Sequence, residues 1–124
     1  MGATHAPDIR ARSFDFAVGV VRLCQKLDAK AGVSRTLGRQ LLRSGTSVGA
    51  NVEEAQAAQS RADFVNKCAI SLKEARETNY WLRLLEASGQ YANTDLKVLA
   101  QESDELSRII GTIIVRTKNG RRDQ

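Results

Sequence analysis

Hydrophobic side chains recur at intervals of three and four residues along much of the chain. Phe16, Val20 and Leu23 share one face of a helix predicted over residues 13–31. Three further stretches have the same period, at residues 37–55, 64–82 and 96–114. Charged and polar residues border each stripe, as in helices that bury one face. The pattern therefore predicts four amphipathic helices and no strands.

Residues suited to helix ends separate these stretches, and the links between them are short. The candidates are Gly32 after the first helix, Ser34 or Thr36 before the second, Ser60 with Asp63 before the third, Gly89 after it, and Asn93 or Thr94 before the fourth. Short links place sequence neighbours side by side, so we expect an all-α, antiparallel up-down-up-down four-helix bundle over residues 13–116. Residues 1–12 are predicted to form a flexible N-terminus and residues 117–124 a flexible basic tail.

The second predicted helix carries small residues where a helix interior usually has leucine or lysine. Gly45 and Gly49 lie one turn apart, among serines and a threonine. Glycine inside a helix costs about 1 kcal/mol relative to alanine. We therefore interpret this segment as a device for close packing and for fixing the register of the helices.

Polar residues on or beside the inner stripes are predicted to form a buried polar layer that sets this register. They are Ser44, Ser47, Asn51 and Asn79. A buried amide needs hydrogen-bond partners, and Asn79 on the third helix is the expected partner of Asn51.

Apolar residues away from the inner stripes form a candidate oligomer interface. They are Phe14, Val18 and Val21 on the first helix and Ile70, Trp81 and Leu84 on the third. A tryptophan flanked by aliphatic residues is typical of an interface anchor. Scattered exposed apolar side chains on a monomer are the alternative interpretation.

Basic residues give the 124-residue chain a formal net charge of +5. Those that gather on the second helix and at the C-terminal end form a candidate nucleic-acid contact: Arg35, Arg39, Arg43, Arg108, Arg116, Lys118, Arg121 and Arg122. Solubility and compensation of a helix dipole are the alternative explanation. The sequence shows no aromatic residues interleaved with these positions, so we expect weak sequence selectivity.

Residue patterns typical of catalysis, cofactor binding or metal binding are lacking. The single histidine, His5, lies in the predicted N-terminal arm, and Cys24 and Cys68 lie far apart on apolar stripes. This distribution gives no zinc spacing, no di-iron motif and no phosphate loop. We therefore expect no enzymatic activity, no cofactor and no small-molecule substrate.

The thiols are expected to stay free in a reducing cytoplasm, because no signal peptide is recognisable. The longest apolar run is too short to span a bilayer, so no membrane contact is expected.

Two motifs give the chain a recognisable resemblance. They are LLRSGTSVGANVEEA at residues 41–55 and SLKEARETNYWL at residues 71–82, with Asp63-Phe64 between them. Together they resemble the bacterial four helix bundle protein family, also called the 23S rRNA intervening-sequence proteins. The resemblance implies a homopentamer. A related branch, the accessory variability proteins of diversity-generating retroelements, forms a basic pentamer that binds a reverse transcriptase and nucleic acid.

Two functional hypotheses follow. The first is a non-enzymatic, homo-oligomeric binding or scaffold protein, pentameric by resemblance, that contacts RNA or DNA through basic surfaces. The alternative is a protein–protein adaptor, such as a reverse-transcriptase accessory subunit, without direct nucleic-acid binding.

Overall fold

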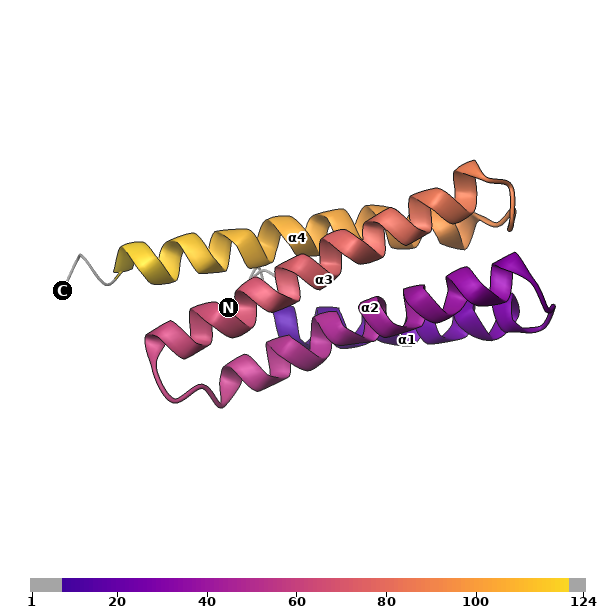
Figure 1. Ribbon diagram of the computed structural model, residues 1–124. Coiled ribbons are helices and arrows are strands. Elements are labelled where there is room, and N and C mark those ends of the chain that lie inside the picture. Colours follow the sequence, from indigo (N-terminus) through magenta and orange to yellow (C-terminus); the bar gives the residue numbers. More distant parts are fainter. Residues whose placement is uncertain (1–7, 121–124) are drawn as a thin grey trace.

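Four antiparallel helices make up the computed structural model, which describes residues 8–120. They are α1 (Ile9–Asp28), α2 (Val33–Gln56), α3 (Arg61–Ala87) and α4 (Thr94–Gly120). Each helix packs against the next in sequence, and α1 also contacts α4, so the four form a bundle (Figure 1). The predicted all-α fold with short links is confirmed.

The first helix begins earlier than the sequence predicted. Asp8 caps it by accepting a hydrogen bond from the backbone N–H of Arg10 at 3.0 Å. Residues 9–12, expected in a flexible N-terminus, are therefore helical. Arg12 anchors this turn to α4, because its guanidinium donates to Glu102 at 2.7 Å and to Glu105 at 3.1 Å. Residues 1–7 lie outside the described part of the chain.

The fourth helix extends through Gly120 and so includes residues 117–120 of the predicted tail.

At the junction between α1 and α2, α1 ends at Asp28, so Gly32 is not its cap. Gly32 instead precedes α2 with a φ of 121°, a conformation that favours glycine. Neither Ser34 nor Thr36 caps α2, because α2 has no side-chain cap hydrogen bond.

The ends of α3 follow the sequence prediction. Ser60 Oγ accepts a hydrogen bond from the N–H of Asp63 at 3.0 Å, and the Asp63 carboxylate accepts one from Gln59 N–H at 3.2 Å. After the last turn, Gly89 has a φ of 71°. The Gly89 N–H donates to the Glu86 carbonyl, and the Gln90 N–H donates to the Leu85 carbonyl. These two backbone hydrogen bonds form a Schellman cap.

At the start of α4, the choice left open by the sequence is resolved. Asn93 Oδ1 accepts a hydrogen bond from Asp95 N–H at 2.8 Å, so Asn93 rather than Thr94 is the cap. Asp95 also lies in the first turn, where a negative charge is favoured by the helix dipole.

Glycines of α2 face α1 and allow the two helices to approach closely. A Cβ at Gly45 would lie 2.8 Å from Val20 Cγ1, and one at Gly49 would lie 3.2 Å from the Ser13 carbonyl oxygen. Both distances are shorter than ordinary van der Waals contact. The structure thus gives a contact for each glycine of the segment that the sequence marked as a close-packing device.

The buried polar layer differs in membership from the prediction. Thr78 Oγ1 donates to Ser44 Oγ at 2.9 Å, and both residues are fully buried between α2 and α3. The predicted pair of Asn51 and Asn79 does not form. Asn51 donates to the Ser47 carbonyl one turn earlier in its own helix, at 2.8 Å. A threonine at a core position carries no hydrophobic signal, which is why the sequence pattern overlooked Thr78.

Asn79 lies on the other side of α3, against α4. Its amide nitrogen donates to the Ala100 carbonyl and to Ser103 Oγ, both at 3.0 Å. It therefore connects α3 to α4, whereas Thr78 connects α3 to α2. The Ser47 hydroxyl donates to the Arg43 carbonyl of the same helix, at 2.7 Å.

Candidate nucleic-acid interface

A groove of about 920 Å³ runs between α3 and α4 and gathers four arginines. We call it the arginine groove; its lining residues are Arg76, Asn79, Arg83, Asp104, Ser107, Arg108, Gly111, Thr112, Val115 and Arg116. Asp104 is the single carboxylate among them. The groove is therefore strongly positive, and it offers planar guanidinium groups that can each bind a phosphate through two hydrogen bonds.

Helical spacing brings these side chains together. Arg76, Asn79 and Arg83 lie three and four residues apart, so they share the face of α3 that adjoins α4. Small residues of α4, Ser107 and Gly111, line the groove opposite them. A Cβ at Gly111 would meet nothing within 4 Å, so this side of α4 has room for a ligand.

The arginines differ in how far they are neutralised. Arg108 pairs with Asp104 one turn earlier at 2.7 Å, on an exposed surface where such a pair contributes little. Arg83 donates from Nε to Asn79 Oδ1 at 2.8 Å, which fixes its direction without cancelling its charge. Within residues 8–120, neither Arg76 nor Arg116 forms an ion pair.

The predicted basic stripe on α2 does not form one open surface. Arg35 donates to the Asp28 carbonyl at 2.9 Å and pairs with its carboxylate, at the α1–α2 junction. Arg43 lies across the α2–α3 seam and pairs with Glu74 and Glu77. Arg39 lines a separate groove of about 350 Å³ between α1 and α2.

Of the predicted C-terminal contacts, Arg108 and Arg116 lie in the arginine groove, and Lys118 lies beside Arg61 at a smaller hollow. Arg121 and Arg122 lie outside the described residues. Arg76 and Arg83 were not among the predicted contacts, because in the sequence they alternate with glutamates and resemble an ordinary solvated face. Their spacing of seven residues, two helical turns, was the available signal.

Trp81 belongs to the α2–α3 seam rather than to an opposite free face. It is half-buried against the core, and its Nε1–H donates to Glu77 Oε2 at 2.9 Å. This hydrogen bond, together with the charge and hydrogen bond of Arg43, lowers the pKa of Glu77 below its usual range. The side of the third helix that the sequence assigned to an interface is thus partly used within the chain.

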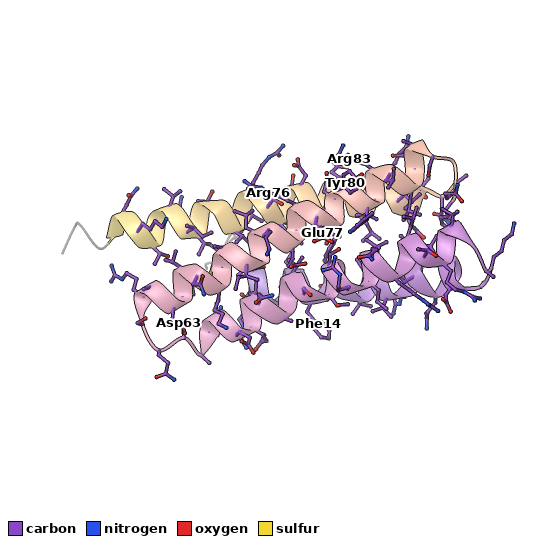
Figure 2. The ribbon with its side chains drawn as sticks, in the orientation of Figure 1. Phe14, Asp63, Arg76, Glu77, Tyr80 and Arg83 are labelled. Atoms are coloured by element: carbon purple, nitrogen blue, oxygen red, sulfur yellow. The ribbon has the colours of Figure 1, made fainter. Side chains whose placement is uncertain are left out.

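The other candidate interface residues differ widely in exposure. Phe14 is 67% exposed and Val21 is 40% exposed, both on α1 (Figure 2 labels Phe14). Val18, Ile70 and Leu84 are half-buried. Leu42, on the adjoining part of α2, is 38% exposed, and further exposed valines lie on α4.

Neither cysteine is placed for chemistry. Cys24 and Cys68 are buried and free, and Cys24 Sγ donates to the Gly38 carbonyl at 3.3 Å. Burial raises the pKa of both thiols, that of Cys24 to about 11, so the nucleophilic thiolate is disfavoured. In the described residues, no three or more His, Cys, Asp or Glu side chains are grouped to hold a metal ion. His5 lies outside them.

No helix within residues 8–120 combines the length and apolar character needed to cross a membrane.

Known proteins similar to this chain were found among family models and among solved structures. The family model described as 23S rRNA-intervening sequence protein matches residues 7–112. The fold is similar to a crystal structure of a protein with unknown function from the S23 ribosomal protein family of Bacteroides thetaiotaomicron VPI-5482. That chain is 41% identical with a TM-score of 0.79, and the match covers 86% of this chain and 98% of that chain. No curated protein matches.

Proposed function

The chain belongs to the family of 23S rRNA-intervening sequence proteins, and from this premise we propose that it is a non-enzymatic protein that binds RNA or DNA through the arginine groove. The observation that carries the proposal is the convergence of four arginines from two helices on one groove with one carboxylate. Phosphate groups are the natural ligand of such a surface, because binding them releases condensed counterions.

A binding role fits the rest of the chain better than a catalytic one. The raised thiol pKa values argue against a cysteine nucleophile. The groove holds four positive side chains and one carboxylate, which suits recognition of an anion more than acid–base chemistry.

We also propose that the protein assembles with copies of itself through the apolar face formed by Phe14, Val21 and Leu42. Val21 and Leu42 line the same groove between α1 and α2, and Phe14 lies two turns from Val21 on α1. Apolar side chains of this size are seldom left exposed together unless they meet a partner. Assembly as the pentamer that the family resemblance implies would repeat the arginine groove and raise the avidity for a long strand.

The nucleic-acid proposal is tested by measuring binding of a fluorescent RNA at several salt concentrations. The double variant Arg76→Gln/Arg116→Gln should weaken binding about tenfold or more and reduce the slope of log affinity against log salt by about 1 to 2. The matched control is Arg22→Gln/Lys30→Gln, which removes the same charge from exposed positions outside the groove.

Two results would contradict the proposal. The first is the absence of RNA and DNA binding even at low salt, which would leave a role in protein–protein contact. The second is an equal loss in the groove variant and in the control, which would mean that net charge rather than the groove attracts the strand.

A further inference from the structure

We infer that the arginine groove takes an unpaired stretch of nucleic acid and that one base of this stretch stacks on Tyr80. The inference rests on the proposed function and names the form of the ligand. Tyr80 has an exposed aromatic ring, and the proposed phosphate contacts give this ring no role.

Tyr80 lies on α3 between two arginines of the groove, four residues after Arg76 and three before Arg83. These spacings place the three side chains on one face, and Figure 2 shows them along the side of α3 nearer α4, with Glu77 on the side nearer α2. Tyr80 is 49% exposed. The basic positions predicted from the sequence have no aromatic residue among them, whereas Arg76 and Arg83, which the structure places in the groove, flank Tyr80.

The Tyr80 ring packs against the ring of Trp81. The two ring centroids lie 5.1 Å apart with the planes at 71°, an edge-to-face arrangement. Trp81 is itself held by the hydrogen bond from its Nε1 to Glu77 and by packing against the core. The tyrosine ring is therefore positioned before any ligand arrives, which lowers the entropic cost of stacking.

An unpaired strand is the ligand that can use both the arginines of the groove and the exposed ring of Tyr80. In a duplex the base faces are stacked on one another and only phosphates and groove edges are accessible, whereas a single strand can place a base on an aromatic ring and its phosphates on arginines. The groove follows α4 from Asp104 to Arg116, about 18 Å at the rise of an α-helix. This elongated shape suits an extended backbone more than a compact anion.

The experiment compares four labelled probes of about 12 nucleotides at low salt: oligo(U), oligo(dT), an abasic strand with the same phosphates, and an RNA duplex. We expect the wild-type protein to bind oligo(U) and oligo(dT) more tightly than the abasic strand or the duplex. Tyr80→Leu should weaken oligo(U) binding by about 5- to 100-fold and leave abasic binding unchanged, since one base–aromatic stack is lost. Tyr80→Phe should retain the wild-type affinity.

Val98→Ala is the control, because it shortens an exposed apolar side chain that lies outside both the arginine groove and the proposed contact between copies. It should bind oligo(U) as the wild type does, and circular dichroism should show the same helicity for all variants. Equal affinities for oligo(U), the abasic strand and the duplex, with no effect of Tyr80→Leu, would overturn the stacking inference while the phosphate proposal stands. Failure of every probe to bind would overturn both.

Discussion

Gly45 illustrates at the residue scale how little space separates α1 from α2. A methyl group there would lie 2.8 and 2.9 Å from the two Val20 methyl carbons, and Val20 is completely buried. Because neither the backbone nor a core valine can move freely, even the smallest side chain is excluded. The glycines of this helix therefore exchange local helix stability for contact between helices.

Gly45→Ala is expected to destabilise the fold by about 1–3 kcal/mol, as overpacking of a well-packed core does. Gly111→Ala is the control, since a methyl group there meets nothing within 4 Å, and it should stabilise the helix by up to about 1 kcal/mol. Urea denaturation followed by circular dichroism measures both changes. A stabilising effect of Gly45→Ala would show that the two helices can separate at no cost.

Asn79 and Asn51 allow a second comparison at the residue scale. Asn79→Ala removes two hydrogen bonds to α4 and leaves the Ala100 carbonyl with one partner fewer, so we expect a loss of about 1–3 kcal/mol. Asn51→Ala removes one bond within a single helix and should change stability by less than about 0.5 kcal/mol. Both substitutions gain the same helix propensity, so the difference in unfolding free energy reports the two bonds to α4 together with the exposed bond that Asn79 accepts from Arg83.

At the scale of elements, α3 connects the bundle, because it contacts both α2 and α4 along its length. One side bears Ser71 and Thr78, which bond to α2, and the other bears Asn79, which bonds to α4. Arg76 and Arg83 of the arginine groove lie on the side of Asn79, and Tyr80 is exposed beside them. Changes at the start of this helix should therefore affect the whole molecule.

Ser60→Ala is expected to destabilise the protein by about 1 kcal/mol, because it leaves the Asp63 N–H without its capping oxygen. Ser34→Ala is the matched control, since Ser34 does not cap α2 and its hydroxyl makes a single exposed bond to the Gln90 carbonyl. Thermal unfolding of both variants provides the measurement. Equal melting temperatures for the two variants would mean that the Ser60 cap contributes no more to stability than the exposed hydrogen bond of Ser34.

The α2–α3 seam gives the bundle a dependence on pH. The hydrogen bond from Trp81, and next the pairing with Arg43, hold the pKa of Glu77 below the ordinary glutamate value of about 4.3. Ionised Glu77 therefore stabilises the folded state above the unfolded pKa, and this contribution disappears as the pH falls through the lower folded pKa.

We expect the fluorescence of Trp81, the single tryptophan, to change as the pH falls below about 4.3, together with a loss of stability. Glu77→Gln keeps an oxygen acceptor for Trp81 but cannot titrate, so both changes should become smaller. Glu53→Gln is a suitable control, because Glu53 pairs with Arg10 at an exposed position away from the tryptophan. An unchanged titration in Glu77→Gln would assign the pH dependence to other carboxylates.

At the scale of the whole molecule, the proposed assembly face lies on a different pair of helices from the arginine groove. Phe14, Val21 and Leu42 belong to α1 and α2, whereas the arginine groove belongs to α3 and α4. The two surfaces can therefore be changed separately. Assembly through one would leave the other free for a strand.

Phe14→Glu is expected to lower the molar mass of the assembly measured by light scattering, because it places a charge in the proposed contact between copies. Val98→Glu is the control, an equally polar change at a valine that is 63% exposed on α4. The separated chains should bind RNA more weakly, because avidity is lost. The slope of log affinity against log salt, counted for one chain, should not change. A wild-type protein that is monomeric at high concentration would remove the assembly proposal.

The sequence by itself determined the number of helices, their order and the caps at both ends of α3. These features depend on local periodicity and on residues such as Ser60 and Gly89, whose preferred conformations act within a few positions of the chain. It also marked the α2 segment around Gly45 as a place of close packing, because the loss of helix propensity is visible without any partner.

Only the tertiary structure decided which polar residues meet and which arginines share a groove. Thr78 pairs with Ser44 and Asn79 with α4 because a rotation of one residue, 100°, moves a side chain from one neighbouring helix to the other. Arg76 and Arg83 join Arg108 and Arg116 through the packing of α3 on α4. Such contacts depend on the relative register of separate helices, which local periodicity does not encode.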